Sequence, residues 1–277
     1  MSTIADLAEN RVVEGTYAVA RKERRRTKTG SDYLALELVD RSGKIEARVW
    51  NDVELLDSRF SEGDAVRVLG RVDKFRDRLQ LDVRAIEHAE GQDAAELTPT
   101  MRRDADELDG FLEFLGAEIS HAGLKTLVGR FLSDERFRSR LRELPASPEA
   151  HHTYAGGLLE HTVAVATLCR ETAQVHPRLR GDLVLVAALL HDAGRTVELG
   201  RGPSFRPTEE GRLLGHVQLG IRLIESHAGG LERGVLAEVV HAVAVHHDGR
   251  AARTAEAAVL YHANQLDAVA ATRPIPD

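Results

Sequence analysis

Histidine and aspartate residues recur in this chain beside strongly apolar segments. Polar side chains in such surroundings need a partner that compensates the loss of their hydration. His191 and Asp192 follow the run Leu183 to Leu190, which is apolar on every helical face and is predicted to be buried all round. A buried, ionised carboxylate needs a cation or several donors, because the loss of its hydration is costly. A divalent metal would supply that compensation. A hydrogen-bonded helix end before Gly194 is the alternative explanation of the pair.

Further residues of the same two types extend this pattern along the second half of the chain. Each lies in or beside an apolar helical segment, and they are His161, His216, His246, His247 and Asp267. Any one of them alone is more often a satisfied core residue, but together with His191 and Asp192 they favour a shared metal site. Imidazole and carboxylate ligands without thiolate suit Mn²⁺, Fe, Co²⁺, Ni²⁺ or Zn²⁺. The set exceeds the needs of one tetrahedral ion, so two ions bridged by Asp192 would use it economically.

Length and composition set the outer bounds of the interpretation. A chain of 277 residues with 43% hydrophobic content predicts two domains with ordinary cores. The net charge of −7 argues against a protein that coats nucleic acid by bulk electrostatics, although it allows a local basic groove. The first residues have no signal-peptide pattern and no window reaches 18 apolar residues, so we expect a cytoplasmic protein without a membrane partner. The single cysteine, Cys169, is expected to be a small buried hydrophobe.

The first third of the chain reads as short strands. Runs with alternating or β-branched apolar residues, separated by turn-like sequences, cover 16–20, 33–39, 44–50, 65–72 and 78–85. Residues 51–60 are expected to hold a short helix. Five strands with a helix between the third and fourth predict an oligonucleotide/oligosaccharide-binding (OB) barrel, whose second and third strands typically carry the ligand face.

That face would present Tyr33, Lys44 and Arg48, because aromatic stacking combined with basic side chains holds single strands with little sequence preference. Trp50 and Phe75 are weaker candidates, since one aromatic at a strand end is more often partly buried. Just before this face, six of the eight residues from 21 to 28 are basic. This cluster, which contains Arg24, Arg25, Arg26 and Lys28, is either a solvated loop or a phosphate contact.

The remainder of the chain reads as helices. Strand periodicity is lost between Glu90 and Pro99, and helical spacing follows in 104–119, 124–132 and 135–144. His151 and His152 then precede a helix that continues to about Val175, in a segment that looks mobile. We therefore expect a multidomain α and β protein, with a five-stranded OB-type barrel in residues 1–91, a linker in 92–102 and an all-helical domain in 103–277.

The histidine motifs resemble those of a known family. The segments that carry the resemblance are HHTYAGGLLEHT at 151–162, LHDAGR at 190–195, LLGH at 213–216 and the pair His246-His247. Their order is similar to that of the HD-domain metal phosphohydrolases, and more narrowly to that of the YhaM-type 3′-to-5′ exoribonucleases. Those proteins also carry an N-terminal barrel, so the resemblance covers about residues 11 to 272.

The resemblance implies metal-dependent hydrolysis of single-stranded RNA from its 3′ end, with single-stranded DNA as a further substrate and nucleoside monophosphates as products. One metal would be held by His161, His191, Asp192 and Asp267, and the other by Asp192, His216 and His246, with His247 as an alternative or additional ligand. Manganese is the expected metal, with cobalt, iron, nickel and zinc as alternatives. The catalytic residues would be His191, Asp192 and Arg195, and His151 and His152 would contact substrate.

One departure from the family concerns Arg195, which stands where those proteins usually have lysine. Arginine keeps the positive charge and can grip a phosphate with two hydrogen bonds, so a role toward the substrate phosphate is retained. Two rival functions belong to other classes. One is a hydrolase of a small nucleotide, which would leave the barrel unexplained. The other is a non-enzymatic single-strand binder that uses metal only for stability, against which the intact ligand set and Arg195 argue.

Overall fold

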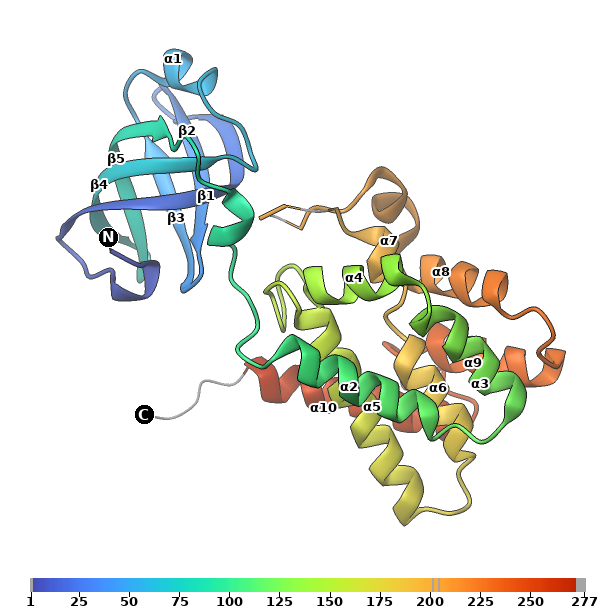
Figure 1. Ribbon diagram of the computed structural model, residues 1–277. Coiled ribbons are helices and arrows are strands. Elements are labelled where there is room, and N and C mark those ends of the chain that lie inside the picture. The colour runs from blue at the N-terminus through green and yellow to red at the C-terminus, as the bar shows by residue number, and fades with distance from the viewer. Residues whose placement is uncertain (1, 201, 204, 273–277) are drawn as a thin grey trace. The chain divides into compact units, whose positions relative to one another are not determined.

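The computed structural model describes residues 2–200, 202–203 and 205–272, which form two compact units (Figure 1). The first unit holds the chain up to Thr100, and the second holds most of the rest. The first consists of strands with short helical turns, and the second is helical. The expected succession of an OB-type barrel and an all-helical domain is thus confirmed. The finer bounds at 91 and 103 stay a prediction.

The first unit is a closed barrel. Its strands are β1 (Val12–Arg26), β2 (Asp32–Asp40), β3 (Gly43–Val49), β4 (Ala65–Phe75) and β5 (Arg78–His88). They follow the order β1-β2-β3-β5-β4, and β4 pairs with β1 to close the barrel. Neighbouring strands are antiparallel, except for the parallel pair of β3 and β5. The expected helix between the third and fourth strands is present as α1 (Val53–Asp57).

The alternation read from the sequence gives the barrel its core. Leu34, Leu36 and Leu38 of β2 point inward, and opposite them Ile45 and Ala47 of β3 do the same. Successive side chains of a strand face opposite sides, so the residues between them are placed on the outer face. That outer face of β2 and β3 therefore carries the polar and aromatic side chains that concern function.

The solvated loop, one of the two alternatives for the basic cluster, is not what most of it forms, because β1 continues through it as far as Arg26. These residues pair with β2 in regular register, and acidic neighbours compensate their charge. Arg24 and Arg26 both bind Asp32, while Arg25 binds Glu23. Like-charged side chains can share a strand here because each has a carboxylate partner across or along it.

The segment predicted as a linker contains a 3₁₀ helix, η2 (Ala94–Leu97). Ala94 is buried against a small apolar patch on the barrel that includes Ala18, Ala20 and Val39, and Leu97 packs at its edge. The chain leaving the last strand is therefore held on the barrel for part of the predicted linker.

The second unit consists of nine helices within the described residues. They are α2 (Ala105–Ala117), α3 (Ala122–Leu132), α4 (Glu135–Glu143), α5 (Gly157–Val175), α6 (Gly181–Leu190), α7 (Arg195–Glu198), α8 (Glu209–His227), α9 (Arg233–Ala244) and α10 (Ala255–Thr272). As predicted, every residue from Leu183 to Leu190 is buried, because α5, α9 and α10 surround α6. No helix of the described residues has both the length and the apolar character that crossing a membrane requires.

Candidate metal centre and nucleic-acid face

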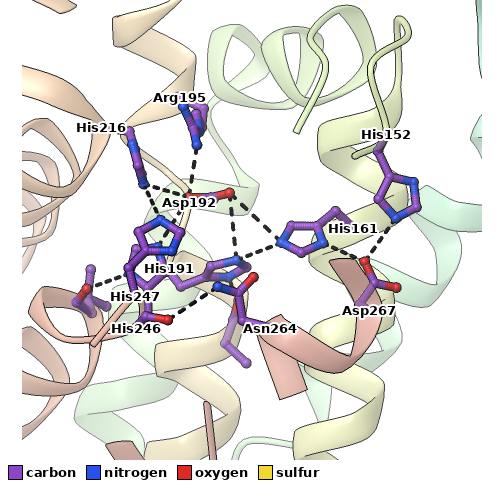
Figure 2. A network of polar contacts seen from close by, with 12 residues as sticks. His152, His161, His191, Asp192, Arg195, His216, His246, His247, Asn264 and Asp267 are labelled. Carbon is purple, nitrogen blue, oxygen red and sulfur yellow. Dashed lines mark hydrogen bonds and ion pairs between the residues drawn. The ribbon is translucent and has the colours of Figure 1, made fainter. Parts of the chain in front are cut away.

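With the exception of Asp267, the predicted metal ligands converge from four helices of the second unit on the carboxylate of Asp192 (Figure 2). His161 lies in the first half of α5, and His191 and Asp192 follow the last residue of α6. His216 lies at a break in α8, where Gly215 has a left-handed backbone with φ of 70°. His246 and His247 follow Val245, the C-cap residue of α9. Most of these side chains thus lie at the end of a helix or at a break within one.

Asp192 stands between two pairs of histidines. Its Oδ2 lies 3.7 Å from Nε2 of His191 and 3.9 Å from Nε2 of His161. Its Oδ1 lies 3.4 Å from Nε2 of His216 and 3.6 Å from Nε2 of His246. Each carboxylate oxygen therefore faces its own pair of imidazoles.

The hydrogen bonds of the histidines decide which nitrogen carries the lone pair. Nδ1 of His191 lies 2.7 Å from the carbonyl of Ala188, and Nδ1 of His246 lies 2.6 Å from that of Val243. A carbonyl only accepts, so both Nδ1 atoms carry the proton and both Nε2 atoms are left with a lone pair. Each ring uses a carbonyl three residues back, one of those that a helix end leaves without an intrahelical donor.

These lone pairs face one another, which is unfavourable unless a cation lies among them. His161 donates from Nδ1 to Asp267 over 2.6 Å, and its Nε2 lies 3.1 Å from Nε2 of His191. Among the described residues, Oδ1 of Asp192 and Nε2 of His246 are buried without a hydrogen-bond partner. Neutral imidazoles and a carboxylate with their acceptor atoms turned inward fit a divalent metal.

Burial and charge hold these groups in the protonation states that a metal needs. Burial would raise the pKa of the Asp192 carboxyl, but His191 and Arg195 beside it lower that pKa well below its usual range. Burial also lowers the pKa of His191 to about 3 and that of His247 to about 4. At neutral pH the carboxylate is therefore ionised and these rings are neutral, so metal binding need not first displace protons from them.

Arg195 lies beside this cluster, and its partner Glu198 was not anticipated from the sequence. Nε of Arg195 is 3.8 Å from Oδ1 of Asp192, and Nη1 donates to Oε2 of Glu198 over 2.7 Å. The other oxygen of Glu198 accepts from the backbone N–H of His216 over 3.2 Å. Glu198 therefore fixes Arg195 and also caps the part of α8 that begins at His216. The i,i+3 spacing of Arg195 and Glu198 on one helix was the available signal.

Asp267 and His152 lie apart from the carboxylate of Asp192. Asp267 contacts the Nδ1 side of His161, and His152 Nε2 lies 2.9 Å from the same Asp267 oxygen (Figure 2). The segment before α5 is therefore tied to α10, in contrast to the mobile character expected for it. His151 packs its ring 4.8 Å from that of His161, and burial lowers its pKa to about 4.

Two further residues complete the inventory of the helical unit. Asn264 was not singled out from the sequence, yet it is buried near the cluster and donates to the carbonyl of His246 over 3.3 Å. Cys169 is fully buried on α5, as expected, and burial raises the pKa of its thiol to about 12.

The outer face of the barrel gathers the aromatic and basic residues predicted for β2 and β3. Tyr33 and Trp50 stack with ring centroids 4.8 Å apart, and the Arg48 guanidinium lies 5.6 Å from the Tyr33 centroid. Trp50 is 47% exposed, so the packing role expected for it describes only part of its surface. Lys44 pairs loosely with Glu37, and Lys28 is exposed in the turn after β1. Trp50 thus gives this face an exposed aromatic surface beside the half-buried Tyr33.

Three family models match the chain. The HD domain matches residues 158–269, which include every histidine and aspartate of the candidate centre. The OB-fold nucleic acid binding domain matches residues 18–89 of the barrel. A model described as a putative helicase matches residues 114–178, from α2 to α5.

The resemblance to the exoribonucleases named YhaM is confirmed by whole-chain comparison. The 3′-5′ exoribonuclease YhaM of Geobacillus sp. (strain WCH70) is 28% identical over 86% of this chain and 76% of its own length. The protein of that name from Listeria monocytogenes serotype 4b (strain CLIP80459) is 28% identical over 73% of this chain, and the match spans 65% of its length. Among solved structures, the second OB-fold domain of replication protein A from Methanococcus maripaludis is 25% identical, with a TM-score of 0.28, covering 33% of this chain and 96% of that domain.

The buried histidines predict how the metal-free protein responds to acid. The pKa of His191 is about 3 in the folded chain against about 6.5 when unfolded, so between these values the unfolded chain binds the extra proton. The contribution of His191 to the free energy of unfolding of the helical unit should therefore be constant above about pH 6.5. The free energy of unfolding should fall as the pH drops from about 6.5 toward 3. Urea unfolding followed by circular dichroism in a chelator measures it. His88→Gln, at an exposed barrel position, should leave the profile unchanged, and a flat profile in wild type would contradict the assignment.

Proposed function

We infer that this chain is a metal-dependent 3′-to-5′ exoribonuclease that hydrolyses phosphodiester bonds of single-stranded RNA to nucleoside monophosphates. The observation that carries this conclusion is the position of Asp192, with one oxygen toward each histidine pair. The OB-fold barrel in the same chain and the relatives named YhaM supply the class of substrate. A cytoplasmic location and single-stranded DNA as a second substrate are part of this proposal.

We propose that the centre holds two divalent ions, with manganese as the native metal and cobalt, iron, nickel or zinc as alternatives. His161, His191 and Asp192 would hold one ion, and Asp192, His216, His246 and His247 the other, following two of the three groups of candidate ligand atoms that converge among the described residues; the third group is His152, His161 and Asp267. Such ions lower the pKa of a water molecule and neutralise charge on a phosphate during hydrolysis.

The residues of the chain prepare the site for a phosphate. Among the described residues, Arg195 is the arginine or lysine closest to Asp192. Glu198 fixes its guanidinium, so little side-chain entropy remains to be lost when a phosphate binds. An arginine held in this way can donate two parallel hydrogen bonds to phosphate oxygens. His151, whose Nε2 is buried without a hydrogen-bond partner among the described residues, would face the substrate beside His161.

The barrel would deliver the strand. Tyr33 and Trp50 offer a stacking surface, and Arg48 adds a positive charge beside it. Arg24, Arg25 and Arg26 are compensated by Glu23 and Asp32, so phosphate must compete with carboxylate for them. Stacking therefore contributes more to this face than bulk positive charge.

The rival functions explain fewer observations. Hydrolysis of a small nucleotide would use the metal centre but leave the stacked pair of the half-buried Tyr33 and the exposed Trp50 without a role. A single-strand binder with a structural metal would need neither Arg195 nor its fixed partner Glu198. Incubation with manganese and either end-labelled RNA or a panel of mononucleotides separates these functions by their products.

Replacement of the central carboxylate is the first test. Asp192→Ala should lose bound metal and all hydrolysis, because neither pair of histidines retains an anionic ligand. Metal per chain is measured by elemental analysis and activity on labelled RNA. Asp106→Ala, which removes a strongly exposed carboxylate of α2, is the matched control and should keep both. Full metal content in Asp192→Ala would contradict the proposed centre.

The direction of degradation is the second test. RNA labelled at its 5′ end should give a descending ladder on a denaturing gel, and a blocked 3′ end should slow its appearance. Circular RNA of the same sequence serves as the control and should remain intact. Early release of internal fragments from the circle would show endonuclease chemistry and overturn the proposed direction, while the metal centre would stand.

The role of the aromatic pair is the third test. Tyr33→Ala and Trp50→Ala should each weaken binding of a long single strand about 5- to 150-fold, since a stacked base contributes roughly 1 to 3 kcal/mol. Hydrolysis of a dinucleotide should stay near the wild-type rate. Leu55→Ala, at another exposed apolar position of the barrel, is the control. Unchanged binding by both aromatic variants, measured by fluorescence anisotropy, would exclude this face.

A further inference from the structure

The segment before α5 contains polar residues that the proposed chemistry leaves without a role. His152 has φ of 45°, in a backbone region that residues with a side chain seldom adopt. Its carbonyl accepts from the N–H of Ala146 and lies directly against Gly157, where a Cβ atom would not fit. The neighbouring backbone is also paired, because Tyr154 and Ala155 accept from Gly157 and Met101. This packing fixes the unusual backbone and aims the His152 ring at α10 (Figure 2).

A chain of hydrogen bonds runs from this segment to a predicted metal ligand. The Tyr154 hydroxyl lies 2.8 Å from Oε2 of Glu160 and 2.7 Å from Nδ1 of His152, so it links these two side chains. Nε2 of His152 then contacts Oδ2 of Asp267 at 2.9 Å. The same oxygen accepts from Nδ1 of His161 at 2.6 Å.

The last bond of this chain determines the orientation of His161. His191 and His246 have Nδ1 fixed by backbone carbonyls of their own helix ends, whereas His161 lies inside α5 and has Asp267 as its acceptor. The contact with Asp267 occupies Nδ1, and Nε2 on the other edge of the ring faces His191 and Asp192. A carboxylate on the Nδ1 edge is badly placed to share an ion bound at Nε2.

We propose that Asp267 is a positioning residue that acts on the metal through His161, and that His152 and Tyr154 hold Asp267 in turn. This assignment differs from the sequence-based prediction, in which Asp267 is a ligand and His152 contacts substrate. It rests on the metal centre of the proposed function and is independent of the substrate. Outer carboxylates that orient a ligating histidine change metal affinity without supplying a bond to the metal.

Titration of the full-length, metal-free protein with Co²⁺ tests the assignment, because the visible spectrum reports coordination separately from affinity. Asp267→Ala should bind Co²⁺ about 10- to 100-fold more weakly than wild type, yet reach the same number of ions and the same spectrum at saturation. His161→Ala, which removes a ligand, should lose an ion or change the spectrum. Loss of an ion, or the spectral change of a lost ligand, in Asp267→Ala would make Asp267 a ligand and overturn the proposal.

Tyr154→Phe tests the outer part of the chain with little change of shape. It should weaken Co²⁺ binding in the same direction as Asp267→Ala, and the double variant should bind no more weakly than Asp267→Ala alone, because Tyr154 acts through Asp267. Tyr17→Phe, which removes a hydrogen-bonded hydroxyl from the barrel, is the matched control and should leave affinity unchanged. Additive effects, or a lower melting temperature of metal-free Tyr154→Phe with unchanged affinity, would reduce Tyr154 to a structural role and overturn its part in the proposal.

The same measurements keep this inference separate from the proposed function. Coupled losses of Co²⁺ affinity in a protein that hydrolyses no RNA would support the positioning role and reject the exoribonuclease activity. If the wild-type protein hydrolyses RNA but Asp267→Ala loses an ion, the exoribonuclease activity would be supported and the positioning role rejected.

Discussion

Asp192 keeps an ionised carboxylate in the interior of the helical unit, beside the imidazole of His191, which is neutral at physiological pH. A buried charge of this kind is tolerated only with a compensating cation or donors, and Arg195 reaches it only at 3.8 Å. His191 cannot supply the missing charge, because burial lowers its pKa to about 3. The arrangement of α5, α6, α8 and α9 therefore fits a metal-binding site. Each of these helices places the nitrogen lone pair of a histidine close to the Asp192 carboxylate, where a metal cation would compensate the negative charge.

The lone pairs are aimed by hydrogen bonds on the far edge of each ring. His191 and His246 use carbonyls near the ends of α6 and α9, so the end of a helix both terminates the element and orients the ligand that follows it. His161, inside a helix, depends on a side chain 106 residues away. The carbonyl contacts of His191 and His246 are local, so they do not depend on how distant segments pack. The contact of His161 with Asp267 instead makes the centre depend on the packing of α10 and of the segment before α5.

The sequence predicted those parts that depend on local pattern. The unbroken apolar run before His191 predicted a helix buried on all sides, and alternation in β2 and β3 predicted the barrel core. Residue type and order predicted which histidines converge. What was missed depends on tertiary partners. Arg24 and Arg26 form a strand and not a loop because Asp32 compensates them from the next strand, and His152 is fixed by Asp267 across the fold. Glu198 could have been suspected from its spacing to Arg195, but its second role toward His216 requires the break at Gly215.

Gly194 follows the central carboxylate and lies where a Cβ atom would collide with the carbonyl of His216 and the N–H of Gly220. The backbone at Gly194 therefore packs directly against the backbone of α8 between His216 and Gly220. No side chain lies between these two segments, so none can repack to change their separation. The separation between Asp192 and His216 is set by that contact. A centre whose width is fixed in this way would select ions by radius and preferred bond length, because its ligands could not follow an ion that is too large or too small.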